Sequence, residues 1–367
     1  MENKQILDFA TRCLREYEAK EVKWNYEIGC VVIACKQLYE ATGERSFLDH
    51  ALRIMEERVS PDGTIPAFRG DKYNIDNMNC GKGLLIALDE TGDERYKKAL
   101  EFLMGVLAKH PRCKCGNFWH KEIYPNQIWL DGLYMAQPLY MEYETRYHNK
   151  EHYNDIIDQF VNVRKYLYDP KKGLYYHGYD ESRQAPWCNK ESGCSANFWS
   201  RACGWYLMAL VDTMDAMSEQ IYEHYRTLED LFREAVHGLI PYLDPESHML
   251  YQVIDHPEAE GNYLETSGSA MAAYAILKAC RMGVLLQEKY LPVGRSMFEG
   301  IVKEKLREDP QGTLRLYDIC DVAGLGPGTE RDGSVAYYLS EPKSVDEAKG
   351  VGAFLMAYSE YLKTGKE

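Results

Sequence analysis

Two kinds of helical segment alternate along the chain, and this alternation restricts the possible folds more than any other feature of the sequence. Six segments carry apolar residues on one face and charged residues on the other, at residues 4–18, 46–59, 94–109, 151–167, 224–243 and 289–306. Between them lie six segments that are apolar nearly all round, at residues 25–41, 76–91, 127–145, 202–219, 267–284 and 349–363. A helix that is apolar on every side must be buried on every side. The pattern therefore predicts an all-α (α/α)6 barrel, with six inner and six outer helices, formed by residues 1–367 as a single domain.

The connections between the two kinds of segment form a second repeat. A Pro-containing helix stop, a turn and a short aromatic-rich run follow five of the amphipathic segments, and these turn signals begin at Ser60, Pro111, Asp169, Asp244 and Glu308. Such runs predict short β-hairpins at one rim of the barrel, next to the starts of the inner helices. The two longest loops, at about 168–201 and 307–348, lead to the same rim. Because long loops in compact domains are usually functional, we expect the binding site there.

Two histidines occupy equivalent places in this second repeat. His120 and His177 each follow a turn glycine by four residues, and side-chain alternation along a strand places them on the same faces as Phe118 and Tyr175. We therefore expect both imidazoles to face the same rim. A purely structural role, as hydrogen-bonded rim histidines, is the alternative interpretation.

Two aspartates lie at the starts of neighbouring inner segments. Asp131 stands among large apolar residues in IWLDGLYM, and Asp76 has the equivalent place in the preceding inner segment. Aspartate is rarely buried without a partner, and packed helices about 8–10 Å apart can bring two carboxylates together. Such a pair raises the pKa of one member, which suits acid and base chemistry. The alternative is a helix-terminus carboxylate that accepts backbone N–H groups and has a lowered pKa.

An arginine enters another inner segment between two tryptophans. Arg201 stands in FWSRACGWYL between Trp199 and Trp205. A guanidinium in this place can hold a carboxylate with two hydrogen bonds while the indoles pack on a sugar ring. The alternative is a structural arginine that satisfies backbone carbonyls or pairs with an aspartate.

Charge and cysteine usage exclude several classes of function. The chain has 43 Lys and Arg against 57 Asp and Glu, a net charge of −14, so it lacks a basic footprint for nucleic acid. No apolar stretch approaches about 18 residues, so we expect no membrane span and no secretion signal. Eleven scattered cysteines suit reduced thiols in the cytoplasm. Cys113 and Cys115 with His110 and His120 are a weak zinc signal, and we predict neither a metal nor a cofactor.

Several stretches of the sequence carry a family resemblance. They are IWLDGLYM, LYYHGYDE, FWSRACGWYLMAL, NYLETSGSAMAAYAI and VAGLGPGTERDGSVAYYLSEPKSVDEAKGVGAFLMA. Together they resemble the unsaturated rhamnogalacturonyl hydrolases, glycoside hydrolase family 105, and more distantly the unsaturated glucuronyl hydrolases. The match runs in order from about Trp24 to Tyr358, nearly the whole chain. It implies the same barrel that the helix pattern predicts independently.

The resemblance also implies roles for individual residues. Asp131 matches the general acid and base, and Asp76 matches its partner carboxylate. The expected substrate-binding residues are His120, Lys121, His177, Trp199, Arg201, Trp205 and Trp24. The implied substrate is a pectin-type oligosaccharide that a polysaccharide lyase has left with a 4,5-unsaturated uronic acid at its non-reducing end. In the implied metal-free reaction, the acid protonates C4, water adds at C5, and the hemiketal collapses and releases the neighbouring sugar.

Other functions stay open at this point. A barrel of this class can hold an unsaturated glucuronyl hydrolase, a sugar epimerase that uses His120 and His177 for proton exchange, or a conventional inverting glycosidase. It can also be a non-catalytic oligosaccharide-binding protein. The identity of the uronate, the neighbouring sugar and the oligomeric state stay open with them.

Overall fold

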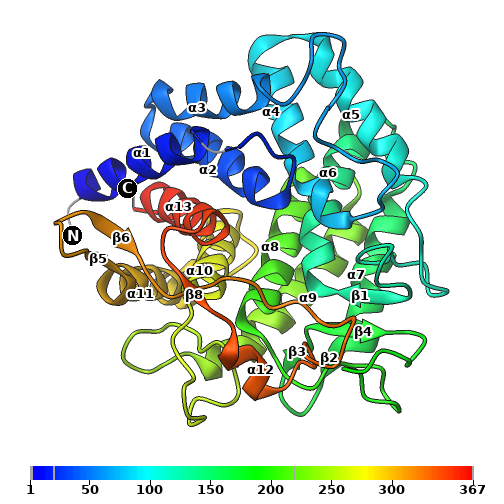
Figure 1. The fold of residues 1–367 in the computed structure, drawn as a ribbon, viewed down its shortest axis with the longest axis vertical. Coiled ribbons are helices and arrows are strands. Elements are labelled where there is room, and N and C mark those ends of the chain that lie inside the picture. Colours follow the sequence, from blue (N-terminus) through cyan, green and yellow to red (C-terminus); the bar gives the residue numbers. More distant parts are fainter. Residues whose placement is uncertain (1–2, 20, 219, 366–367) are drawn as a thin grey trace.

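Two concentric rings of helices form the computed structural model (Figure 1), which describes residues 3–19, 21–218 and 220–365. Within these residues, the inner ring consists of α2 (Tyr26–Thr42), the 3-10 helix η1 (Ile75–Gly81) with α4 (Lys82–Thr91), α6 (Leu130–Arg146), α8 (Ser200–Ala216), α10 (Thr266–Arg281) and α13 (Ala348–Lys363). The outer ring consists of α1 (Asn3–Glu18), α3 (Arg45–Glu56), α5 (Glu94–Leu107), α7 (Tyr153–Leu167), α9 (Tyr222–Leu239) and α11 (Gln287–Lys305). The predicted helical barrel is therefore confirmed.

Contacts between neighbouring helices close the inner ring. α2 packs on η1, and the series continues through α6, α8, α10 and α13 back to α2. Figure 1 shows α13, in red, beside α1 and α2, in blue, so the end of the chain seals the ring against its beginning. Every residue from Thr266 to Cys280 in α10 is buried, whereas α3 buries one face only. The two kinds of segment thus occupy the two environments that their apolar patterns require.

The second inner segment differs from the prediction of one continuous helix over residues 76–91. Its first part is the 3-10 helix η1, and only its second part, α4, is α-helical. The indole Nε1 of Trp24 donates to the carbonyl oxygen of Asn77 at 2.9 Å. In a continuous α-helix that oxygen accepts the N–H of the residue four positions later. The hydrogen bond from Trp24 anchors η1 from outside the ring.

Four short two-stranded ladders are present in the described part of the chain. β2 (Tyr168–Asp169) pairs with β3 (Leu174–Tyr175), and β5 (Leu306–Glu308) pairs with β6 (Leu314–Leu316), as predicted for the turns at Asp169 and Glu308. Two further ladders were not predicted: β1 (Gln127–Trp129) with β4 (Gly178–Asp180), and β7 (Ile319–Cys320) with β8 (Lys343–Ser344). The other three predicted hairpins form no named strand there. The Ser60 N–H closes its turn by donating to the Thr64 carbonyl oxygen at 2.9 Å, and the turn at Pro111 has a single antiparallel bridge between Arg112 and Phe118.

Three further observations bear on the sequence predictions. None of the described helices is long and apolar enough to cross a membrane. The eleven cysteines are free thiols, and all except Cys115 are buried. A short helix, α12 (Val335–Ser340), interrupts the long loop at 307–348, and residue 219 of the predicted segment 202–219 lies outside the described residues.

Turns that follow outer helices pack against the next outer helix and so lock the outer ring. A Cβ added at Gly238 in α9 would lie 1.8 Å from the carbonyl oxygen of Gly173, in the preceding turn. A Cβ added at Gly300 in α11 would lie 1.8 Å from the carbonyl oxygen of Ser247. Only glycine permits such close approach of two backbones. The last turn reaches the first helix, because Arg12 of α1 donates to a carbonyl oxygen of β6 at 2.8 Å.

We predict that Gly300→Ala lowers the stability of the barrel. At an open helix position this change stabilises by about 0.5–1 kcal/mol, but here the methyl group would push the Ser247 turn away from α11, which costs about 1–3 kcal/mol. Gly105→Ala in α5 is the matched control, since nothing lies within 4 Å of its Cβ position. Thermal unfolding should give a lower Tm for Gly300→Ala and an equal or higher Tm for Gly105→Ala. An unchanged Tm for Gly300→Ala would contradict the close approach.

Candidate active site

A ring of polar side chains marks the rim where the inner helices begin. The second residue of each inner helix is polar, and these residues are Glu27, Asp76, Asp131, Arg201, Ser267 and Lys349. The first turn of a helix has free backbone N–H groups and a partial positive charge. A rim made of six such ends favours anionic groups.

A cavity of about 110 Å³ opens at this rim. Its walls combine carboxylates, cations and aromatic rings, and they are formed by Tyr26, Asp76, His120, Lys121, Tyr124, Trp129, Asp131, Met135, Trp199, Arg201, Trp205, Val322, Ala323, Gly324 and Arg331. The structure therefore brings together seven of the nine residues that the sequence analysis selected. The two others are His177 and Trp24.

Two larger hollows lie elsewhere. One, of about 500 Å³, lies between α1, α11 and α13, and the other, of about 470 Å³, lies near the opposite ends of the inner helices, around Glu40, Asp212 and Lys278. We place the candidate site in the smaller cavity because both predicted aspartates converge there.

Backbone pairing brings His120 and Lys121 to Asp76. The N–H of Ile75 donates to the carbonyl oxygen of His120 at 3.1 Å, which fixes this segment beside the start of η1. Lys121 Nζ then lies 2.8 Å from Asp76 Oδ2, and His120 Nε2 lies 3.6 Å from Asp76 Oδ1. Asp76 thus faces one ammonium group and one imidazole across the cavity wall.

The charges of these two partners differ. Burial lowers the pKa of His120 to about 4, so this imidazole is neutral near pH 7. Burial also lowers the pKa of Lys121, but the charge of Asp76 and the hydrogen bond to it outweigh burial and leave the pKa above its ordinary value. Lys121 therefore stays charged opposite the Asp76 carboxylate.

A β-ladder places His177 behind Asp131. Strands β1 and β4 pair, and the N–H of Leu130 donates to the carbonyl oxygen of His177 at 3.1 Å. The Nε2 atom of His177 lies 3.4 Å from Asp131 Oδ2, and its Nδ1 atom lies 2.9 Å from the Tyr338 hydroxyl oxygen. His177 is completely buried, so it backs the carboxylate instead of lining the cavity. When the Tyr338 hydroxyl donates to Nδ1, the Nε2–H group faces Asp131.

The pKa of Asp131 does not follow the expectation for a carboxylate pair. Burial raises it, but the imidazole of His177 beside the carboxylate, with smaller effects of His120 and Arg201, outweighs burial and holds the pKa below its ordinary value. The negative charge of Asp76 was expected to repel that of Asp131 and so raise its pKa, but Lys121 pairs with Asp76 and offsets this charge. In the unliganded protein Asp131 is therefore an anion near neutral pH, and it holds a proton only after its surroundings change.

Trp129 separates the two histidines. Its ring stacks on His120 with centroids 4.1 Å apart, and its centroid lies 5.4 Å from that of His177. Tyr124 stacks on Trp129 at 5.0 Å. His120 lines the cavity and the buried His177 lies behind Asp131, so the two imidazoles share one indole that the sequence analysis did not select. Its place two residues before Asp131 is the signal that identifies it.

The guanidinium of Arg201 donates hydrogen bonds to the backbone of the protein itself. The group donates to the carbonyl oxygens of Cys320 and Asp321, the second at 3.3 Å, and it lies 4.6 Å from the ring centroid of Trp199. These bonds hold the start of the loop that covers the cavity. The contacts of Arg201 in the unliganded protein are therefore those of a structural arginine, although its side chain also lines the cavity.

Trp24, an expected substrate-binding residue, lies outside the cavity lining. Trp24 is buried away from the cavity lining, where it donates to Asn77 and packs near Phe68 with ring centroids 6.2 Å apart. Its position supports η1, which carries Asp76. The cysteine and histidine group at 110–120 forms no metal cluster in the described ranges, and the Nε2 atom of His110 lies 2.8 Å from the Trp119 carbonyl oxygen.

Arg331 is a cavity residue that the sequence analysis missed. It lies between β7 and α12, is exposed, and its guanidinium forms no hydrogen bond or ion pair with the part of the chain that the structure describes. Its Nη1 atom lies 3.3 Å from the Cβ position of Gly324, in the cavity wall. The sequence contains one signal for Arg331: it lies in the long loop at 307–348, which was expected to lead to this rim.

Comparisons with known proteins show the family of the chain. The chain matches the family model described as Glycosyl Hydrolase Family 88 over residues 1–365. It is similar to the solved structure of a glycoside hydrolase of family 105 from C. acetobutylicum, with 40% identity, a TM-score of 0.92 and coverage of 97% of this chain and 99% of that chain.

Two curated relatives extend the comparison. The unsaturated rhamnogalacturonyl hydrolase YesR of Bacillus subtilis is 24% identical over 371 residues, which cover 100% of this chain and 97% of the relative. Protein Atu3128 of Agrobacterium fabrum is 40% identical over 233 residues, which cover 62% of this chain and 98% of the relative. The family match and the alignment with YesR include every helix and loop that contributes to the cavity.

Proposed function

The chain belongs to Glycosyl Hydrolase Family 88 and is a glycosidase, and we propose that it removes a 4,5-unsaturated uronic acid from the non-reducing end of lyase-generated, pectin-type oligosaccharides. This is the activity of an unsaturated rhamnogalacturonyl hydrolase, the name carried by the Bacillus subtilis relative that aligns along the whole chain. We also propose that residues 1–367 act as one catalytic domain. The free thiols support a cytoplasmic location.

The charge arrangement around Asp131 carries this proposal. The Asp131 carboxylate is 14% exposed and faces a cavity whose walls include Lys121, Arg201 and Arg331. The chain as a whole has a net charge of −14, but repulsion from distant charges is screened beyond about 8 Å at physiological salt. The cations of the cavity therefore govern binding. The carboxylate of a uronate can pair with them, whereas a neutral sugar cannot.

Binding of the uronate supplies the proton donor that the unliganded protein lacks. A bound carboxylate adds a negative charge near Asp131, and a like charge raises the pKa of a carboxyl group. The cavity loses water at the same time, which also favours the neutral carboxylic acid. Asp131 thus takes up a proton as the substrate enters.

The reaction then uses one carboxyl group twice. Asp131 gives its proton to C4 of the alkene, the π electrons form the new C4–H bond, and C5 becomes an oxocarbenium ion with the ring oxygen. Water adds to C5 and returns a proton to Asp131. The resulting hemiketal opens, and the neighbouring sugar leaves from C1. Trp129, Trp199 and Trp205 provide apolar walls for the sugar rings.

The geometry gives less support to an epimerase. An epimerase needs two groups that exchange protons with the sugar, and both histidines are at least nine-tenths buried beside Trp129. The low pKa of His120, about 4, also removes it as a proton donor near pH 7. Glucuronyl and galacturonyl substrates carry the same carboxylate and would contact the same cations. An experiment is therefore needed to choose between them.

The direct test follows the alkene. A panel of lyase-generated unsaturated disaccharides, with galacturonyl or glucuronyl ends, should lose its ultraviolet absorbance in step with release of the neighbouring sugar. Asp131→Asn removes the proton donor with little change in shape and should lower kcat by about 10²- to 10⁴-fold. Its circular dichroism spectrum and substrate binding should persist. Asp89→Asn, at the far end of α4, is the control and should retain kcat.

Each alternative gives a different result in this test. Cleavage of saturated substrates at equal rates would indicate a conventional inverting glycosidase, and a changed sugar in a chain of unchanged length would indicate an epimerase. Substantial activity in Asp131→Asn would remove Asp131 from the mechanism.

The pH dependence of kcat/KM reports the free enzyme, and the acid must be protonated. Activity therefore falls as the pH rises through the pKa of Asp131, which His177 holds below its ordinary value. We predict that His177→Leu raises this pKa and moves the falling limb to higher pH, whatever its effect on the maximal rate. His120→Leu should move the limb less, because His120 is neutral and contributes less. If the falling limb of the kcat/KM profile stays at the same pH in His177→Leu, the assignment of that limb to Asp131 is refuted.

The two arginines of the cavity should differ in their effects. Arg331→Gln should raise KM for an unsaturated uronate about 10- to 150-fold, since a hydrogen bond to a charged group contributes about 1.5–3 kcal/mol. It should have a much smaller effect on an analogue with an uncharged group in place of the carboxylate. Arg201→Lys loses the planar fork that holds the 320–321 backbone, so it should lower kcat/KM on both substrates alike and lower Tm. If Arg201→Lys instead affects the uronate more than the uncharged analogue, while Arg331→Gln affects both alike, then Arg201 binds the carboxylate of the substrate.

A further inference from the structure

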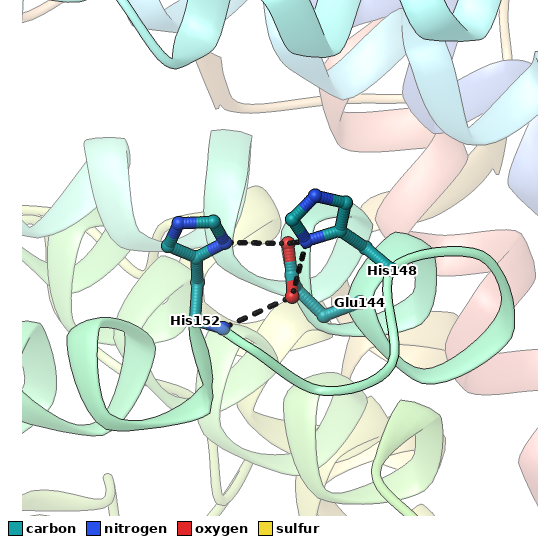
Figure 2. Close-up of side chains that lie close together, drawn as sticks. All are labelled: Glu144, His148 and His152. Carbon is teal, nitrogen blue, oxygen red and sulfur yellow. Dashed lines mark hydrogen bonds and ion pairs between the residues drawn. The ribbon is translucent and has the colours of Figure 1, made fainter.

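A second cluster of chemically active side chains lies at the far end of α6, away from the cavity. Glu144, His148 and His152 point toward one another there (Figure 2). The Nδ1 atom of His148 lies 3.1 Å from Glu144 Oε1, and the Nδ1 atom of His152 lies 3.0 Å from the same oxygen. One potential ligand atom from each residue lies within 4.8 Å of the other two.

The backbone holds this cluster in place. Asn149 and Lys150 have left-handed φ angles of 53° and 65°, which turn the chain sharply between α6 and α7. The N–H of Lys150 donates to the Glu144 carbonyl oxygen at 2.9 Å, and the N–H of His152 donates to Glu144 Oε2 at 3.0 Å. The Glu144 side chain is only 2% exposed, so its carboxylate is a fixed point around which the loop folds.

The donor set suits a transition metal. Two imidazoles and one carboxylate are ligands for Zn²⁺, which prefers four donors at about 2.0–2.2 Å in a tetrahedron. Such a tetrahedron separates its donor atoms by about 3.3 Å, so the observed separations from Glu144 need to grow by only a few tenths of an ångström. The histidine side chains are 38% and 48% exposed, which gives an ion access. Water, or Glu151 with its Oε2 atom 3.9 Å from His148 Nδ1, can complete the coordination.

We propose that Glu144, His148 and His152 form a binding site for one Zn²⁺ ion that fastens the end of α6 to the start of α7. The site lies about 20 Å from Asp131 along α6, at about 1.5 Å per residue. Its role is therefore structural and separate from the sugar chemistry. Without an ion, the two Nδ1–H groups donate to the carboxylate, and metal binding replaces those protons.

Calorimetric titration of the chelator-treated, tag-free protein with zinc chloride tests the proposal. We expect one Zn²⁺ per chain and a rise in Tm of a few degrees at saturating zinc, because the ion binds the folded state. Magnesium chloride should give neither effect, since Mg²⁺ prefers oxygen ligands.

Variants locate the site. The double variant His148→Gln/His152→Gln should lose both the stoichiometric binding and the zinc-dependent rise in Tm, and each single variant should bind zinc at least about tenfold more weakly. Glutamine retains an N–H group for Glu144, so the Tm without zinc should stay close to that of the parent. His256→Gln is the matched control, because His256 lies near two carboxylates, of Asp255 and Glu258, at 3.8 and 3.5 Å. It should bind one Zn²⁺ like the parent.

Three results would overturn the proposal. They are failure of the parent chain to bind zinc, stoichiometric binding that survives in the double variant, and a rise in Tm that His256→Gln removes as well. If the double variant does not fold, the tenfold criterion for the single variants decides the same question.

Discussion

The six inner helices have apolar side chains on nearly every side, and such helices leave water only when other helices enclose them completely. An outer helix before each inner helix supplies the enclosure and also brings the chain to the rim where that inner helix begins. All inner helices therefore run in the same direction and begin at the same rim. Because of this shared direction, three of the six side chains at the second helical position, those of Asp76, Asp131 and Arg201, come from different helices to line one cavity.

Hydrogen bonds from outside the rings give the cavity its chemistry. The segment before β1 carries His120 and Lys121 to Asp76, and β4 carries His177 to Asp131. The barrel supplies the carboxylates and the connections supply the groups that set their charge. This division lets the loops change the recognition of a substrate while the packed rings stay the same. It also explains how a chain of net charge −14 presents cations at one point of its surface.

The sequence predicts the rings well and the site in part. Apolar periodicity is a local property, so it places all the barrel helices, and it fails only at η1, where it does not distinguish a 3-10 helix from an α-helix. The pKa of Asp131 depends on His177, which a β-ladder between distant strands brings close, and no local pattern contains that pairing. Arg201 illustrates the same limit, since its backbone partners lie about 120 residues further along the chain. Glu144, His148 and His152 follow one another at a spacing of four residues in the sequence. That spacing suggests one face of a continuous helix, whereas the three side chains meet across the turn between α6 and α7.

The seam between α13 and the first two helices has a consequence for how the protein is made. Arg12 and Asp346 form an ion pair across it at 2.9 Å, and these residues lie 334 positions apart. Contacts so distant in sequence form late and slow the folding of a chain. During synthesis, α2 and α10 expose apolar faces until α13 emerges, and such intermediates aggregate readily. The fold therefore makes the arrival of α13 a condition for burial of these two faces.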